Sequence, residues 1–259
     1  MSIARTASLS RPATYAWRVA TLLAVLVGWE LSVQTGYLSA YTFTPPSAIL
    51  ALLAEWIASG SVATHVWTTF FEAAVGYALG VAIGVTLALT FAFVRSLDEL
   101  VHPLIAALNA IPKIVLAPLF ILWLGLDMKA KIVQAAVMVL FVVFYNVYAG
   151  IKNVDRDLIN SARVMGASRR QLLTAVYLPA TFVWLMTSLR IGVGFAFIGA
   201  IIGEYVGANR GLGYLIGVAT AVGDMSIVYA GLTMVMLVVG TVDAVLGRLE
   251  RPFTAWRLF

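Results

Sequence analysis

The stretch WTTFFEAAVGYALGVAIGVTLALTFAFV, residues 67 to 94, decides the fold of this chain. It is apolar apart from Glu72 and a few hydroxyl side chains, and it exceeds the roughly 20 residues that a helix needs to cross a bilayer core. Gly76, Gly80 and Gly84 recur at every fourth position, so they lie along one helix face where a neighbouring backbone can approach closely. The stretch therefore predicts a transmembrane helix packed tightly against another helix.

The composition extends this prediction to the whole chain. Of its 259 residues, 62% are hydrophobic and only 11% are charged, whereas a soluble domain carries about 25% charged residues. The length accommodates roughly six spans and leaves no room for a separate soluble domain. The net charge of +5 comes from basic residues scattered through apolar sequence, which favours cytoplasmic loops of a membrane protein over a nucleic-acid-binding surface. The sequence therefore predicts an all-α integral membrane protein.

The apolar segments predict six spans between a tail at 1–16 and a tail at 248–259. The spans are expected at about 17–38, 67–94, 102–125, 132–150, 181–203 and 227–247. A secretory signal is the alternative for the first, but the run is longer than a signal core of roughly 7–15 residues. Residues 48–57 form an amphipathic segment expected at the membrane surface.

The third segment is interrupted by Pro103, Pro112 and Pro118. Each proline removes a backbone donor and bends or breaks a helix. Such breaks are tolerated at membrane depth where protein or a watery cavity satisfies the backbone. We therefore expect a broken helix inside the bundle.

Basic residues predict the orientation, because cytoplasmic loops are enriched in Lys and Arg. One side holds Arg5, Arg11, Arg18, Arg95, Lys152, Arg156, Arg163, Arg169, Arg170, Arg248, Arg251 and Arg257. The loops on the other side hold Lys129, Lys131 and Arg210. This asymmetry places both termini and the connection at 151–179 in the cytoplasm.

That connection is the most informative loop. Residues 158–165 have apolar positions at helical spacing, Gly166 fits a helix stop, and Ser168 can cap a second helix that runs toward Pro179. The pattern predicts a helix, a sharp turn and a helix at the membrane surface. A basic hairpin that only contacts anionic lipid is the simpler alternative.

The spacing of Ala162, Gly166 and the pair Leu178-Pro179 resembles the EAA loop of binding-protein-dependent ABC importer permeases. Asn160 and Ser161 stand where that family usually has Glu and Ala, and the effect of this replacement is left open. The resemblance implies a loop that docks on a cytoplasmic ATPase subunit and transmits its motion. The implied coupling residues are Asn160, Ser161, Ala162, Arg163, Met165, Gly166, Ala167, Ser168, Arg169, Arg170, Leu178 and Pro179.

Two further stretches, IPKIVLAPLFILWLG at 111–125 and GEYVGANRGLGYLI at 203–216, resemble the nitrate, sulfonate, taurine and bicarbonate branch of these permeases. The resemblance implies a type I importer bundle in the bacterial inner membrane. It also implies a homodimer, two ATPase subunits that bind ATP and Mg, and an external solute-binding protein. A small organic anion is the favoured solute, while pyrimidines and flavins stay open.

The chain lacks the motifs of an enzyme. None of its four lysines follows a glycine, so no Gly-Lys-Ser/Thr phosphate loop exists and ATP is expected in another chain. His65 and His102 are not spaced as metal ligands, and the absence of cysteine excludes thiolate sites. We expect no catalytic residue, no metal and no cofactor in this chain.

Polar groups within spans are costly and are therefore functional candidates. The pathway candidates are Asn109, Lys113, Arg190 and Glu204. Lys113 and Arg190 are expected to make the pathway attractive to an anion. Structural pairing is favoured for Glu30, Glu72 and Asp243, although an ion-gradient-driven carrier would use such acids as coupling sites. That carrier is the main rival, and an intramembrane enzyme is a weaker one.

Overall fold

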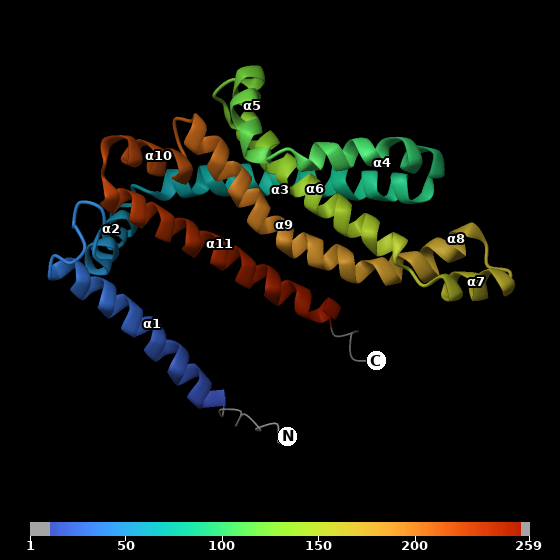
Figure 1. The fold of residues 1–259 in the computed structure, drawn as a ribbon, viewed down its shortest axis with the longest axis horizontal. Coiled ribbons are helices and arrows are strands. Elements are labelled where there is room, and N and C mark those ends of the chain that lie inside the picture. Colours follow the sequence, from blue (N-terminus) through green and yellow to red (C-terminus); the bar gives the residue numbers. More distant parts are fainter. Residues whose placement is uncertain (1–10, 255–259) are drawn as a thin grey trace.

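The computed structural model describes residues 11–254, which form helices joined by turns and short loops and contain no strand (Figure 1). Arg5 and Arg257, which the orientation argument counts, lie outside this range. The elements are α1 (Arg11–Gln34), α2 (Pro46–Ser59), α3 (Ala63–Phe93), α4 (Arg95–Ala110), the 3₁₀ turn η1 (Lys113–Leu116), α5 (Ala117–Leu124), α6 (Met128–Lys152), α7 (Arg156–Val164), α8 (Arg169–Gln171), the π-helical turn η2 (Leu172–Tyr177), α9 (Leu178–Val206), α10 (Leu212–Val222) and α11 (Met225–Thr254).

The long apolar helices confirm the predicted membrane fold. Among the described residues, five helices are long and apolar enough to cross a membrane, and α4 with η1–α5 makes a sixth if that bent pair counts as one span. Helices continue beyond the predicted spans, since α1 already begins at Arg11 and α11 runs to Thr254. The exact boundaries of the tails and of the membrane domain remain predictions.

The core is formed by α3, α6 and α9, with Val139, Val143 and Phe144 at its centre. The glycine face of α3 packs on α6 as predicted. A Cβ atom on Gly80 would lie 2.6 Å from the carbonyl oxygen of Ala136 and 2.7 Å from Cβ of Val139. Only glycine allows the two backbones to approach this closely.

The third segment is broken as expected, but its predicted place inside the bundle was wrong for the single chain. At Ile111 and Pro112 the helical path turns by 86° between α4 and η1–α5. Leu104, Ile114 and Leu122 are exposed, and α5 projects away from the other helices in Figure 1. The turn carries these apolar side chains outward, where lipid or another chain must cover them.

The short helix α2 stands where the amphipathic segment was predicted. Its buried Ile49 and Leu53 pack with Ala230 and Met234 of α11. The carboxylate of Glu30 at the end of α1 accepts the N–H of Ser47 at 2.9 Å and its hydroxyl at 2.7 Å. Glu30 therefore fixes the start of α2, which is the structural role expected for it.

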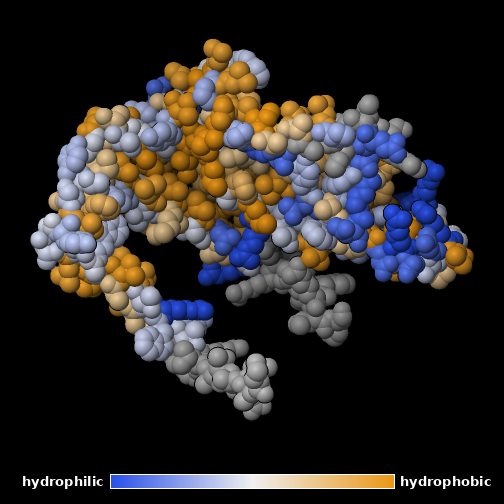
Figure 2. All heavy atoms as spheres, viewed as in Figure 1, coloured by the Kyte–Doolittle hydropathy of each residue, from blue (hydrophilic) through white to orange (hydrophobic). Residues whose placement is uncertain are grey.

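The two ends of the molecule differ in polarity. In Figure 1, α2 and α10 lie at the left and the α7–α8 hairpin lies at the far right, while α1 and α11 run from the left toward the lower middle. Hydrophilic residues gather over α7 and α8, and hydrophobic residues cover much of the middle (Figure 2). The cytoplasmic placement of the hairpin and of both termini stays a prediction from the basic residues.

Candidate functional site

The first helix of the predicted coupling loop is α7. The side chain of Asp155 accepts the N–H of Asp157 at 2.8 Å and caps its start. At its end, Gly166 adopts φ +82°, its N–H donates to the carbonyl of Arg163 at 2.9 Å, and the N–H of Ala167 donates to Ala162 at 3.0 Å. This pair of bonds is the Schellman ending, in which a left-handed glycine closes a helix.

The second helix starts at Ser168 with a reciprocal cap. Its hydroxyl accepts the N–H of Gln171 at 3.3 Å, and the Gln171 side-chain oxygen accepts the N–H of Ser168 at 2.8 Å. The π-helical turn η2 follows, in which the N–H of Leu178 bonds to the carbonyl of Leu173. Because Pro179 has no N–H and its ring crowds the preceding turn, the wider π turn lets helical structure continue from Arg169 to Val206. The second helix of the hairpin is therefore continuous with α9.

A small core of its own holds the hairpin together. Val154, Ile159, Leu172 and Val176 are buried against one another. Tyr177 packs edge-on against Phe93 at the end of α3, with ring centroids 5.1 Å apart. The hairpin is thus fixed to both α3 and α9.

The tip of the hairpin exposes apolar side chains. Val164 is 88% exposed and Met165 is 81% exposed. Of the other predicted coupling residues, Ala162 and Ala167 are half-buried under the tip, while those exposed are Asn160, Ser161, Arg163, Gly166, Ser168, Arg169, Arg170, Leu178 and Pro179. The structure therefore offers an apolar knob beside basic side chains at the polar end of the molecule.

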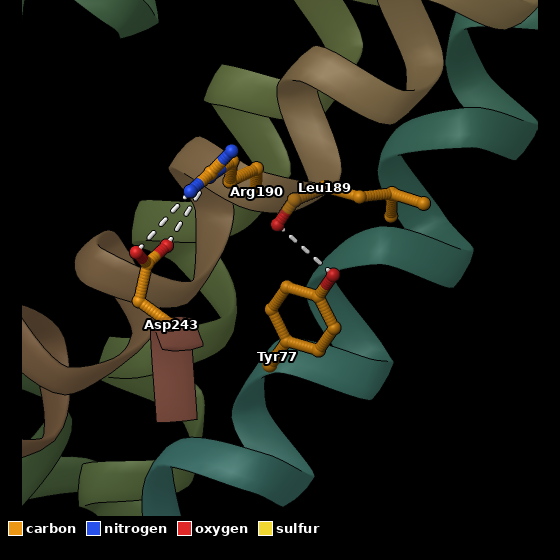
Figure 3. Close-up of polar contacts among 4 residues, drawn as sticks. All are labelled: Tyr77, Leu189, Arg190 and Asp243. Atoms are coloured by element: carbon orange, nitrogen blue, oxygen red, sulfur yellow. Dashed lines mark hydrogen bonds and ion pairs between the residues drawn. The ribbon is translucent and has the colours of Figure 1, made fainter. Parts of the chain in front are cut away.

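Of the pathway candidates, Arg190 on α9 faces Asp243 on α11 (Figure 3). Nε of Arg190 lies 3.3 Å from Oδ1 of Asp243, and Nη2 lies 3.3 Å from Oδ2. Their side chains are 53% and 48% exposed. The carboxylate offsets the charge of Arg190, and charges within spans face a bundle interior or water rather than lipid.

Lys113 and Asn109 lie together at the break in the third segment. Nζ of Lys113 donates to Oδ1 of Asn109 at 2.8 Å and to its carbonyl at 3.0 Å. The ammonium group also lies 4.7 Å from the ring centre of Phe141 on α6. Lys113 therefore contacts Asn109 of α4 and Phe141 of α6, whereas Arg190 pairs with Asp243 of α11.

An apolar cleft of about 390 Å³ lies between α3, α9 and α11. Its walls include Phe70, Tyr77, Phe197 and Leu246. The hydroxyl of Tyr77 donates to the carbonyl of Leu189 at 3.0 Å, next to Arg190 (Figure 3). The cleft thus adjoins the ion pair.

Glu204 is almost fully buried, at the junction of α3, α9 and α10. Its carboxylate accepts the hydroxyl of Thr69 at 2.7 Å and the N–H of Gly213 at 2.7 Å. The pathway role predicted for Glu204 was based on its position in the sequence alone, whereas these bonds place it at the beginning of α10.

Lys131 is the polar residue that the sequence interpretation placed wrongly. It was counted among exposed loop residues, but it lies within α6 and is 1% exposed. Its ammonium group donates to the carbonyls of Leu126 and Asp127 at 2.6 Å and 3.2 Å. A lysine at the edge of an apolar run is typical of an interface, so no sequence signal distinguished it from Lys129.

Comparison with known proteins identifies the family. Residues 80–254 match the family described as binding-protein-dependent transport system inner membrane component. The chain belongs to this family. The resemblance inferred from the Gly166 loop is therefore confirmed, and the chain is a permease of the ABC importer class.

The names of proteins related to this permease specify different solutes. It is 36% identical over 91% of its length, and 88% of the relative's, to a riboflavin transport system permease protein of Chloroflexus aurantiacus. It is 31% identical over 94% of its length, and 89% of the relative's, to a putative aliphatic sulfonates transport permease protein of Bacillus subtilis. A chain of the MetNI methionine ABC transporter, in an inward-facing conformation, shares its fold with a TM-score of 0.64 at 21% identity, covering 74% of this chain and 95% of that one.

Proposed function

We propose that this permease couples to a cytoplasmic ATPase through the α7–α8 hairpin, as the membrane subunit of an ATP-driven importer. The observation that carries the proposal is the exposed pair Val164 and Met165 at a turn held rigid by Gly166. The tip has the size and chemistry of a knob for an apolar groove, and Arg163, Arg169 and Arg170 can pair with acidic residues around it. The continuous helix from Arg169 would carry the motion into α9.

The complete importer would contain two copies of this permease, two ATPase subunits and an external solute-binding protein in the bacterial inner membrane. ATP and Mg would be bound by the ATPase subunits. The family description supports the binding protein. The exposed apolar surface of α4 and α5 supports contact with another chain or with lipid.

The solute we propose is a small organic anion such as a sulfonate. Asn109 and Lys113 at the break, with Arg190 deeper along α9, would line its route. The half-exposed ammonium of Lys113 and the sulfonate permease relative support this choice. Because Asp243 offsets Arg190, Lys113 would supply most of the attraction for an anion. A pathway role for Glu204 would be indirect, through α10.

A planar heterocycle of the riboflavin type is a second candidate. The riboflavin permease relative favours it, and so does the cleft lined by Phe70, Tyr77 and Phe197. Aromatic rings stack favourably on such side chains.

The first experiment is co-purification of a candidate ATPase with the native permease, with Gly166→Trp and with Gly60→Trp. Both glycines have positive φ and open space around the missing Cβ, so backbone strain is matched. Capture should be lost only with Gly166→Trp. Capture by no form of the folded permease, with uptake that collapses on adding an uncoupler, would instead support an ion-driven carrier.

The solute is tested in vesicles that contain the permease, the ATPase and a candidate binding protein. ATP-dependent uptake of an alkanesulfonate, lowered by Lys113→Met, would support the anion. Uptake of riboflavin that is unaffected by Lys113→Met but lowered by Phe197→Ala would support the heterocycle.

A further inference from the structure

Four buried polar side chains meet at the end of the molecule opposite the hairpin. Thr69 and Glu72 come from α3, Lys131 from α6 and Glu204 from α9, and none is more than 2% exposed. We call these four residues the outer cluster. Burying charges is costly unless they are paired and hydrogen-bonded, so the partners of each charge show what the cluster holds.

Lys131 holds the end of the broken third segment. Its ammonium group binds the carbonyls of Leu126 and Asp127, which follow α5 after a left-handed turn at Gly125 with φ +81°. Leu126 and Asp127 form the link from α5 to α6, and Asp127 is the N-cap of α6, so the ammonium group fixes the chain where it leaves α5. The position of the α5 end therefore depends on Lys131.

Glu204 holds the beginning of α10. It accepts the N–H of Gly213 at 2.7 Å, while the hydroxyl of Thr69 accepts the N–H of Leu212 at 2.8 Å. His65 adds a third contact, since its Nδ1 accepts the N–H of Gly211 at 3.1 Å. An anion at the amino end of a helix is stabilised by the free N–H groups and the dipole. The first turn of α10 thus depends on Glu204 and its neighbours on α3.

Glu72 is the remaining charged residue of the outer cluster. Its carboxyl group lies beside that of Glu204, with Lys131 nearby. Two carboxylates side by side repel each other, and the ammonium group of Lys131 is the opposite charge that the cluster supplies. Asp127, through its carbonyl, and His65, through Gly211, are the titratable residues at its edges.

The link between α9 and α10 also packs against α5 near the cluster. A Cβ on Gly207, which follows α9, would lie 2.9 Å from Leu126 and 3.2 Å from Ile121 of α5. The link from α9 to α10 therefore packs directly on the α5 end that Lys131 holds.

We propose that Lys131, Glu204 and Glu72 fasten the end of α5 and the start of α10 into one rigid unit, which forms the outer gate of the permease. They are positioning residues, because none of them needs to touch the solute. The role of this unit as a gate rests on the proposed transport function, whereas its rigidity is a property of the chain itself. The hairpin would couple the permease to the ATPase on the inner side, and this rigid unit would form the gate on the outer side.

The first test uses hydrogen exchange of the native permease and needs no variant. Amides of 211–213 are expected to exchange as slowly as those of the α6 core, because buried side chains hold them. Exchange as fast as at the exposed residues 39–41 before α2 would overturn the proposal.

The second test measures the distance between α5 and α10. The chain has no cysteine, so spin labels can be attached at Leu122→Cys and Val222→Cys alone. These sites are 79% and 74% exposed in the native chain. Samples with a single label identify distances between two copies of the chain, and the remaining distance is that between α5 and α10. One narrow distance is expected with and without nucleotide-bound ATPase. A distance that changes between these two states would show that the helices move separately and would overturn the proposal.

Variants separate the cluster from general effects on folding. Lys131→Met and Glu204→Gln should broaden the distance, while Lys129→Met, which removes an exposed lysine two residues away, should leave it narrow. Glu72→Gln should also leave it narrow, because the amide has the same size and can donate to Glu204, whereas Glu72→Ala should broaden it. A narrow distance in folded Lys131→Met would overturn the proposal. These variant measurements need no ATPase. The rigid-unit proposal can therefore fail while the ATPase-capture experiment supports the proposed function.

Discussion

Asp98 at the start of α4 accepts a 2.7 Å ion-paired hydrogen bond from Lys152 in the last turn of α6. The hydroxyl of Tyr148, one turn earlier on α6, also donates to Asp98. Lys152 stands shortly before α7, so this pair ties the broken third segment directly to the stem of the hairpin. A movement of the hairpin would reach α4 as well as α9.

Asp98→Asn should therefore weaken coupling more than stability. The pair is partly exposed, and such pairs contribute about 1 kcal/mol or less to folding. We expect an almost unchanged melting temperature and fewer solute molecules moved per ATP hydrolysed. Lys152→Arg keeps the pair and should keep the native ratio; a native ratio in Asp98→Asn would contradict the idea.

Charge at the hairpin tip should prevent ATPase binding. Val164→Asp or Met165→Asp places a carboxylate where the proposed groove needs an apolar group, so affinity should fall at least about tenfold, or 1.4 kcal/mol. Neither side chain packs in the hairpin core, so the melting temperature should not change. Val222→Asp makes the same change on α10, at a site that is 74% exposed, and should bind normally. The measurement is ATPase titration in detergent.

The features that sequence predicted are those set by local chemistry. Six apolar segments follow from composition, the α3–α6 contact from Gly76, Gly80 and Gly84, and the hairpin turn from Gly166. Each depends on a periodicity or on a glycine whose backbone geometry is distinctive. These signals lie within one segment and need no knowledge of distant partners.

The features that sequence missed depend on partners far apart in the chain. Glu204 meets Thr69 across 135 positions, and no local pattern records that pairing. The sequence places Lys131 in a loop because the apolar run of the predicted span begins at residue 132, and only the carbonyls after α5 explain its burial. The third segment was expected inside because of its prolines, but their positions do not fix the direction in which a broken helix turns.

Substitution in the glycine face of α3 should loosen the core. In Gly80→Ala the new methyl group would overlap the Ala136 carbonyl and Val139, so α3 and α6 must separate, at a cost of about 1–3 kcal/mol for overpacking. Gly240→Ala on α11 has nothing within 4 Å of the new Cβ and should be neutral or slightly stabilising. Melting temperatures in detergent make the comparison. Equal values for the two variants would mean that the α3–α6 approach is not tight.

A double-mutant cycle on Arg190 and Asp243 should separate pairing from attraction of an anion. Arg190→Met alone leaves Asp243 without this partner, and the loss should lie between the roughly 1 kcal/mol of an exposed pair and the 3–5 kcal/mol of a buried one. Arg190→Met with Asp243→Leu removes both charges and should recover much of that stability. If the pair only joins α9 to α11, anion uptake by the double variant should approach the native rate. If uptake stays low while stability recovers, Arg190 acts on the solute despite its neutralising partner, and the attraction inferred from its position in the span is correct.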